Sequence, residues 1–239
     1  MKHQMSLLYV ISFSALPVTA GFLVQSLGYV DCPSFLFPCD MNADGRMDVL
    51  CSAWDDSSIV LFENLPQGWS KTTLVENFYG ATSVCAADLN DDGFTDIAGT
   101  SWEENTLACW FGSSSGSWSR QVISNELTYA HEVAACDING DGCTDLVTAS
   151  AGSDRISLWI NGGETSPSWS EQTISGSMTG ARSVCCSDLD GNGTIDIAAA
   201  AMGNNSVRWW SNDRGSSPAW SEHSLTENFE GDLINLENI

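Results

Sequence analysis

Positive charge is scarce in this chain. Eight Lys and Arg residues stand against 31 Asp and Glu residues among 239 positions, and the formal net charge is −23 at pH 7. A field of that sign repels phosphate groups, so it excludes nucleic acid as a partner and favours cations. No apolar run reaches the roughly 18 residues that a membrane-spanning helix needs, so we expect no membrane span.

Signals of catalysis are also sparse. The three His residues are scattered, and no nucleophile–base pair, nucleotide-binding glycine loop or His-rich metal site occurs. The nine Cys residues follow no metal or redox spacing; an odd number leaves at least one free thiol or an intermolecular bond. Disorder is excluded as well, because 43% hydrophobic residues with 10 Trp and 9 Phe can form a core.

The first 20 residues have the pattern of a secretory signal peptide. A short charged start precedes an apolar stretch at residues 7–16, and Val18-Thr19-Ala20 forms a small-x-small end. We predict cleavage after Ala20 and a secreted or cell-surface chain of residues 21–239. The alternative is that the apolar stretch forms a buried first strand.

A nine-residue acidic motif occurs four times. It reads Asp-x-Asn/Asp-x-Asp/Asn-Gly-x-x-Asp, and the copies occupy residues 40–48, 88–96, 137–145 and 188–196. An aromatic residue follows each first Asp by 22 positions, and a Trp-Ser pair comes later in every repeat. These residues are Phe62, Trp110, Trp159 and Trp210, then Trp69, Trp118, Trp169 and Trp220. The shared register indicates repeated units, and we expect both aromatic series to pack between them.

Each repeat is predicted to form four short strands. In the second repeat they cover residues 81–87, 95–100, 106–110 and 118–123. Regular turn signals without helical periodicity predict an all-β chain. Four strands in a unit of roughly 50 residues predict a β-propeller of four-stranded blades, with four recognisable blades. A β-sandwich of unrelated hairpins is the alternative, but it would not explain the shared register.

The acidic motifs have the donors of a calcium site. A hard cation takes several oxygen ligands, which positions 1, 3, 5 and 9 supply if the chain turns sharply at the Gly of position 6. Position 7 would add its backbone carbonyl. We predict up to four structural Ca²⁺ sites; Mg²⁺ fits less well, because its small octahedral shell suits a flexible ring poorly. The predicted ligands are Asp40, Asn42, Asp44, Arg46, Asp48, Asp88, Asn90, Asp92, Phe94, Asp96, Asp137, Asn139, Asp141, Cys143, Asp145, Asp188, Asp190, Asn192, Thr194 and Asp196.

A second set of residues lies at the opposite end of the predicted blades. Trp54 and Trp102 open the turns between the second and third strands, next to acidic residues. The connections between repeats add Tyr79, Tyr129, His131, Glu132 and Arg182. Aromatic rings beside carboxylates can stack on and hydrogen-bond a sugar, so this set is a candidate ligand face. Ordinary packing and solvated turns are the alternative.

The acidic loops, with Gly80-Ala81-Thr82-Ser83-Val84 and Gly180-Ala181-Arg182-Ser183-Val184, resemble FG-GAP/VCBS repeats. Those repeats form the Ca²⁺-binding β-propeller of integrin α chains and of many secreted bacterial proteins. The resemblance covers about residues 21–231 and implies that the loop residues are calcium ligands. Family members include adhesins, lectins and accessory domains of enzymes, so the resemblance implies binding without identifying a ligand.

Blade number separates this chain from the family pattern. Family propellers usually close with seven blades, which at this repeat length would need about 340 residues. The strand pattern fails after Gly231. We therefore expect a fragment of a longer propeller, an open arc, or one part of an oligomeric ring.

The function expected from these features is a non-catalytic, calcium-stabilised interaction or cell-adhesion module. Its partner would be an extracellular protein or a glycan. Two alternatives stay open. The first is a carbohydrate-binding, lectin-like propeller or an accessory domain of a polysaccharide-active enzyme. The second is a propeller hydrolase or lyase, for which only His131 with Glu132 offers acid–base groups.

Overall fold

The computed structural model of the chain describes residues 7–12, 23–213 and 218–226. All regular structure in these residues is β, in eighteen strands. This part of the chain contains no helix that could cross a membrane. The predicted all-β class is confirmed.

Sixteen of the strands form four antiparallel sheets, each built from four strands that are consecutive in the sequence. Blade 1 contains β3 (Pro33–Cys39), β4 (Asp48–Ala53), β5 (Ser58–Leu65) and β6 (Gly68–Val75). Blade 2 contains β7 (Ala81–Ala87), β8 (Asp96–Ser101), β9 (Thr106–Phe111) and β10 (Ser119–Ser124). Blade 3 contains β11 (Ala130–Cys136), β12 (Asp145–Ser150), β13 (Arg155–Asn161) and β14 (Trp169–Ser175). Blade 4 contains β15 (Ala181–Ser187), β16 (Asp196–Ala201), β17 (Ser206–Asn212) and β18 (Trp220–Thr226). The predicted strands of the second repeat therefore agree with blade 2 to within one residue at each end.

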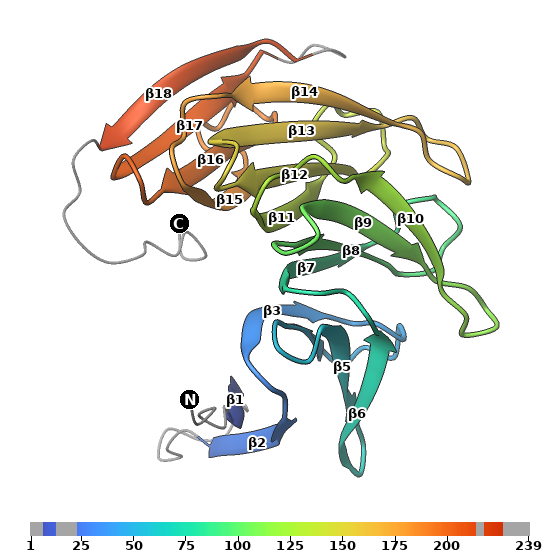
Figure 1. The fold of residues 1–239 in the computed structure, drawn as a ribbon. Coiled ribbons are helices and arrows are strands. Elements are labelled where there is room, and N and C mark those ends of the chain that lie inside the picture. Colours follow the sequence, from blue (N-terminus) through green and yellow to red (C-terminus); the bar gives the residue numbers. More distant parts are fainter. Residues whose placement is uncertain (1–6, 13–22, 214–217, 227–239) are drawn as a thin grey trace, which may run out of the picture.

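The four blades fan out in an arc (Figure 1). The first strand of each blade, β3, β7, β11 and β15, lies along the inner side of the arc, and each contacts the first strand of the next blade. Within the described residues the arc does not close into a ring. The prediction of four blades in an incomplete ring is confirmed for this part of the chain.

A separate two-stranded sheet precedes blade 1. In it β1 (Leu7–Ser12) pairs antiparallel with β2 (Leu23–Tyr29). Leu27 and Val30 are buried against blade 1, in the same cluster as Phe62. The apolar stretch at 7–16 thus contributes a strand, while the predicted cleavage point after Ala20 lies outside the described residues and stays a prediction.

The core lies between neighbouring blades. The second strand of each blade is buried along almost its whole length. In blades 2 and 3 a neighbouring blade covers each face, and in blade 1 Leu27 and Val30 pack on the side that has no blade. Small residues dominate these strands, as in the Asp-Ile-Ala-Ala-Ala-Ala segment of β16, and let the sheets approach closely. The aromatic series packs into the same space: Trp110 of blade 2 shares a cluster with Leu50 and Ile59 of blade 1. The predicted packing between units is confirmed for Trp110, Trp159 and Trp210, whereas Phe62 packs within blade 1 and against Leu27 and Val30, which precede it.

Two buried Asn side chains join consecutive blades. Asn161 Nδ2 at the end of β13 donates to the Leu89 carbonyl of blade 2 at 2.8 Å and to the Thr144 carbonyl at 3.0 Å. Asn212 Nδ2 repeats this arrangement one blade later, with the Ile138 carbonyl of blade 3 at 2.8 Å. Because these carbonyls are shielded from water, the amides provide the hydrogen bonds that they need.

Replacement of Asn161 by Ala should destabilise the protein by about 1–3 kcal/mol, because two shielded carbonyl oxygens lose their donor. Urea denaturation measures this loss. Asn64→Ala is the matched control: Asn64 holds the same repeat position in blade 1, but its Nδ2 donates only to Met47 O, at 3.3 Å and within its own blade. Equal losses in the two variants would contradict a role for Asn161 in joining blades.

Candidate functional site

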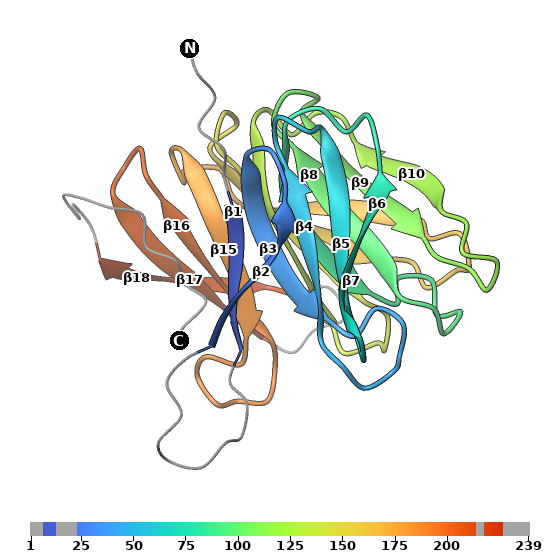
Figure 2. The same cartoon turned by 90° about the horizontal axis from the view of Figure 1, so that it is seen from below.

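The four acidic loops, at residues 40–48, 88–96, 137–145 and 188–196, join the first and second strands of their blades. They project from one edge of the arc, which is the lower edge in Figure 2. In each loop the residue before position 1 pairs with the Asp of position 9, as Cys39 does with Asp48. The predicted placement of the last Asp at the start of the second strand is therefore confirmed.

Positive backbone φ angles turn the chain inside each loop. The Gly at position 6 has φ between 83° and 92° in all four copies, as predicted. Position 4 is also left-handed, at Ala43, Asp91, Gly140 and Gly191, with φ from 56° to 74°. This second turn was not predicted, because position 4 has no common residue type. Together the two turns bring the side-chain oxygens of positions 1 and 3 to one backbone N–H, that of position 5.

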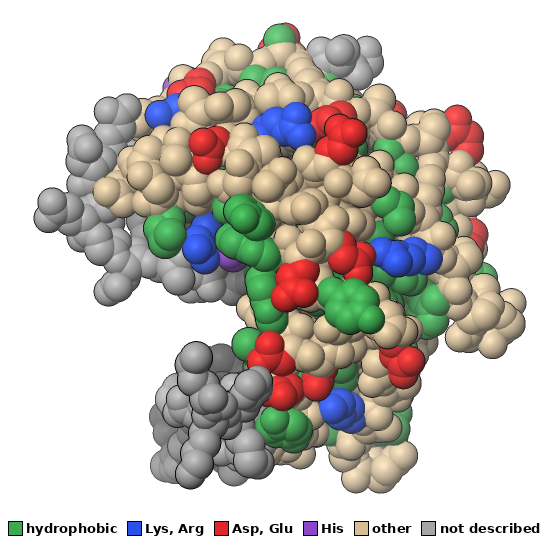
Figure 3. Space-filling model, in the orientation of Figure 1, with side chains coloured by type: hydrophobic (Ala, Val, Ile, Leu, Met, Phe, Trp, Pro, Cys, Tyr) green, Lys and Arg blue, Asp and Glu red, His purple; other side chains and the backbone are tan. Residues whose placement is uncertain are grey.

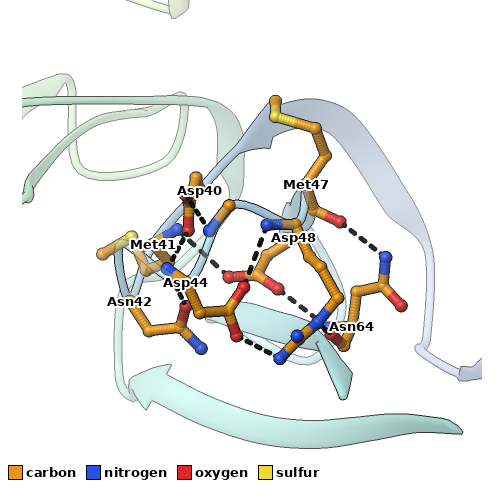
Figure 4. A network of polar contacts seen from close by, with 9 residues as sticks. Asp40, Met41, Asn42, Asp44, Met47, Asp48 and Asn64 are labelled. Carbon is orange, nitrogen blue, oxygen red and sulfur yellow. Dashed lines mark hydrogen bonds and ion pairs between the residues drawn. The ribbon is translucent and has the colours of Figure 1, made fainter. Parts of the chain in front are cut away.

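Hydrogen bonds inside the first loop show how these side chains are held (Figure 4). Asp40 accepts the backbone N–H of Asp44 at 3.0 Å on Oδ1 and that of Gly45 at 2.8 Å on Oδ2. Asn42 Oδ1 also accepts the Asp44 N–H, at 3.1 Å. The same three contacts recur in the other loops. Position 1 is thus fixed by the backbone of the loop that it opens.

The Asp at position 9 is fully buried in every loop. Asp48 accepts the Met41 N–H at 3.1 Å on Oδ2 and the Asn64 N–H at 2.8 Å on Oδ1, and the other copies do the same. Burial raises the pKa of Asp96 and of Asp145 to about 6. Their backbone hydrogen bonds oppose that rise in pKa, and the other carboxylates of the same loop add to it.

The donor chemistry of the loops fits a hard cation. Positions 1, 3, 5 and 9 offer only carboxylate and amide oxygens, the atoms that Ca²⁺ prefers. In the fourth loop Asp188, Asp190 and Asp196 each place a carboxylate oxygen within 4.8 Å of the others. It is the one group of three acidic, His or Cys side chains so arranged within the described residues. The other loops have Asn at position 3, so their donors include an amide at that point.

Position 7 was expected to contribute only its backbone carbonyl. Its N–H donates to the position 5 side chain in every loop, and its own side chain differs from loop to loop. Arg46 is the exception that the sequence did not reveal, because its guanidinium pairs with Asp44. The inter-blade residues Asn161 and Asn212 were also missed, although both follow the first Asp of their repeat by 24 positions.

At the opposite edge of the arc the structure brings together aromatic residues from three successive repeats. Trp102 stacks on Tyr129, with ring centroids 4.5 Å apart and planes 17° apart. Trp54 lies 6.0 Å from Trp102 in a tilted arrangement, and His131 meets the Trp102 ring edge-on at 5.9 Å. These residues therefore come together at the edge away from the acidic loops, and a ligand-binding role for this edge stays a prediction.

Arg182, His131 and Glu132, the basic and acidic members of the predicted set, are partly buried. Arg182 Nη1 and His131 Nε2 are 3.1 Å apart, and both residues occupy bulges at equivalent positions of β15 and β11. Burial, together with the Arg182 charge, lowers the pKa of His131 to about 4, so the imidazole is neutral at pH 7. Glu132 Oε2 accepts the Val184 N–H at 3.0 Å. His131 and Glu132 thus have different partners and serve as links between blades 3 and 4.

Tyr79 lies apart from the stacked rings. Its side chain is 52% exposed, and its backbone N–H donates to Glu104 Oε1 at 3.2 Å. Figure 3 looks onto this edge of the arc and shows hydrophobic side chains interspersed with acidic and a few basic ones. We call Trp54, Trp102, Tyr129, His131 and Arg182 the aromatic face.

All nine cysteines are free in the structure. Burial raises the pKa of Cys39, Cys51, Cys85 and Cys109 to about 12. These thiols therefore stay protonated at neutral pH and behave as small apolar residues of the core.

Comparison with known proteins agrees with this architecture. A crystal structure of a protein from Lactobacillus plantarum has a TM-score of 0.62 and 13% identity, covering 97% of this chain and 70% of that one. An auxiliary nutrient binding protein from Bacteroides ovatus has a TM-score of 0.57 and 13% identity, covering 85% of this chain and 49% of that one. This chain thus spans about half the length of the Bacteroides protein. Identities this low show a shared fold alone.

No curated protein matches the sequence. A family model described as an FG-GAP-like repeat matches residues 40–99, 88–148 and 137–199. Each match begins at the first Asp of an acidic loop, and together the matches span well over half of the chain. With its repeated loops and four-stranded blades, the chain belongs to the FG-GAP-like repeat family.

Proposed function

We propose that this protein is a secreted or cell-surface binding module whose acidic loops bind Ca²⁺ and whose aromatic face binds an extracellular partner. The observation that carries the calcium part is the recurrence of one loop geometry in four blades, in which the position 1 carboxylate accepts the N–H groups of positions 5 and 6 and the position 3 oxygen lies at the same position 5 N–H. The convergence of three carboxylates in the fourth loop adds to this support.

Charge is the physical reason for a cation at these loops. Each loop concentrates at least three carboxylates at the start of a buried strand, and like charges so close disfavour the folded state. Calcium would neutralise them and join the two strands that each loop connects. With a Kd near 10⁻⁴ M and millimolar Ca²⁺, each site would add about 1.4 kcal/mol of stability. The role proposed for the ion is therefore structural.

Removal of calcium should lower the melting temperature. Four sites of this strength correspond to a decrease of roughly 10–20 °C between 1 mM Ca²⁺ and excess EDTA, because a chain of this size gains a few degrees per kcal/mol. Differential scanning calorimetry gives the shift, isothermal titration calorimetry gives the stoichiometry, and Mg²⁺ serves as the control ion. An unchanged melting curve together with no heat of Ca²⁺ binding would refute the calcium proposal.

The stabilisation by Ca²⁺ should weaken as the pH falls through about 6. Asp96 and Asp145 have a pKa of about 6 in the calcium-free fold, so below that pH protons compete with the cation for the same carboxylates. The quantity to measure is the difference between the melting temperatures in Ca²⁺ and in EDTA, from pH 7.5 to pH 5. Titration of His131 and of other groups far from the loops changes both melting temperatures equally, so it does not change their difference. A difference that stays constant over this range would contradict a role for these carboxylates.

The partner proposed for the aromatic face is a glycan. Trp102, Tyr129 and Trp54 gather flat apolar rings at an exposed edge, with acidic side chains close by, and sugars stack on such rings while their hydroxyls are hydrogen-bonded. The similar Bacteroides ovatus structure is an auxiliary nutrient binding protein, which is in keeping with ligand binding on this fold. An extracellular protein is the second candidate partner, and it corresponds to an adhesion role.

Trp102→Ala should abolish glycan binding, because it removes the ring that contacts both Trp54 and Tyr129. A glycan array probed in Ca²⁺ identifies the ligand, and titration of the variant measures the loss. Trp209→Ala is the matched control, since Trp209 stacks on His223 at 4.2 Å in blade 4, outside the aromatic face. Binding that survives Trp102→Ala would place the ligand elsewhere, and an array without hits would favour a protein partner.

A further inference from the structure

The first acidic loop differs from the other three at position 7. The Arg46 guanidinium donates from Nη2 to Asp44 Oδ2 and from Nε to the Asn64 carbonyl, while the Arg46 backbone N–H donates to Asp44 Oδ1 at 2.9 Å. Both carboxylate oxygens of Asp44 are therefore engaged by one residue. Figure 4 shows Asp44 beside Asp40, Asn42 and Asp48.

No positive charge takes this place in the other loops. The second oxygen of Asp92 accepts from Asn90 Nδ2 at 3.0 Å, and Phe94 at position 7 is 42% exposed. The second oxygen of Asp141 accepts from Asn139 Nδ2 at 2.8 Å. In the fourth loop the position 7 hydroxyl donates to the neutral amide at position 5. These partners are neutral amides and hydroxyls, which leave the carboxylate charge uncompensated.

The loop charges follow from this difference. The first loop has three Asp and one Arg, which gives −3 + 1 = −2, whereas the third and fourth loops have three Asp each, −3. The second loop has four, because Asp91 adds one at position 4, and carries −4. A divalent cation entering the first loop would meet the weakest attraction and would also have to displace a guanidinium from Asp44, or share that carboxylate with it.

We propose that Arg46 acts as an internal counter-ion that makes the first loop the weakest of the four calcium sites. This rests on the proposed function of the loops in binding Ca²⁺. The Arg46–Asp44 pair is partly solvated, with side-chain exposures of 36% and 25%, so Arg46 would weaken calcium binding at the first loop only moderately. The sites would then fill in a fixed order, with the first loop last, and the first loop would depend least on calcium for its structure.

The amide of the position 6 glycine reports on each loop separately, because its N–H donates to the position 1 carboxylate. With the protein labelled by ¹⁵N-glycine, a Ca²⁺ titration followed by NMR gives one binding curve per loop. The four reporters are Gly45, Gly93, Gly142 and Gly193. We expect the Gly45 curve to have its midpoint at a Ca²⁺ concentration on the order of tenfold higher than the other three.

Arg46→Gln tests the cause of that difference. It removes the guanidinium and should bring the Gly45 midpoint down to those of the other glycines. Arg155→Gln is the matched control, because it removes the same charge from an ion pair with Glu171 (3.3 Å) in blade 3 and should leave Gly45 last. A Gly45 midpoint equal to or below the others in the unaltered protein overturns the proposal. So does a Gly45 midpoint that Arg46→Gln leaves unchanged.

A measurement without calcium separates this inference from the calcium proposal. In EDTA, Arg46→Gln should lower the melting temperature more than Arg155→Gln does, because the carboxylates of the first loop lose their only neutralising charge. If no glycine amide responds to Ca²⁺, the calcium proposal fails and the ranking of sites fails with it. An equal melting temperature for the two variants in EDTA overturns the counter-ion role, whether or not calcium binds.

Discussion

The buried Asp at the end of each acidic loop is the residue on which the blade depends. Its two carboxylate oxygens accept one N–H from the start of the loop and one from the end of the third strand, as Asp48 does with Met41 and Asn64. One side chain thus connects the loop, the second strand and the third strand. Because a buried carboxylate is stable only when its hydrogen bonds are complete, this residue fixes the position of the loop relative to the sheet. The position of this Asp therefore also sets where the other oxygen donors of the loop lie.

Local features of this fold could be predicted from the sequence, and contacts between blades could not. The strand limits, the turn at position 6 and the burial of Trp110 follow from spacing and residue type within one repeat. The hydrogen bond from Asn161 to Leu89 depends on how far one blade is rotated against the next, which no single repeat encodes. The pairing of Arg46 with Asp44 was missed for another reason: at position 7 only the backbone was expected to matter, although the two residues are neighbours in the sequence.

The two edges of the arc are built in different ways, one from a repeated motif and the other from unlike residues. The acidic loops carry one motif in one geometry, so the repeat explains all four together. The aromatic face uses different residue types at related positions, such as Trp102 in a turn and His131 in a bulge, and it is assembled from residues of all four blades. The bulges matter here because His131 and Arg182, the extra residues of their inner strands, contact side chains of neighbouring blades. Variation at this edge can therefore change the exposed side chains without disturbing the repeat.

Gly112 holds in blade 2 the position that Asn161 and Asn212 hold in blades 3 and 4. A Cβ atom there would come within 2.7 Å of the Thr95 carbonyl, so a longer side chain does not fit. The boundary between blades 1 and 2 consequently lacks the hydrogen bond from an Asn side-chain amide that joins blades 2 and 3 and blades 3 and 4. It relies on apolar packing and on the hydrogen bond from the Ser52 hydroxyl to the Thr82 carbonyl. Under a pulling force the arc would come apart at this boundary, with the first blade detaching while the other three stay together.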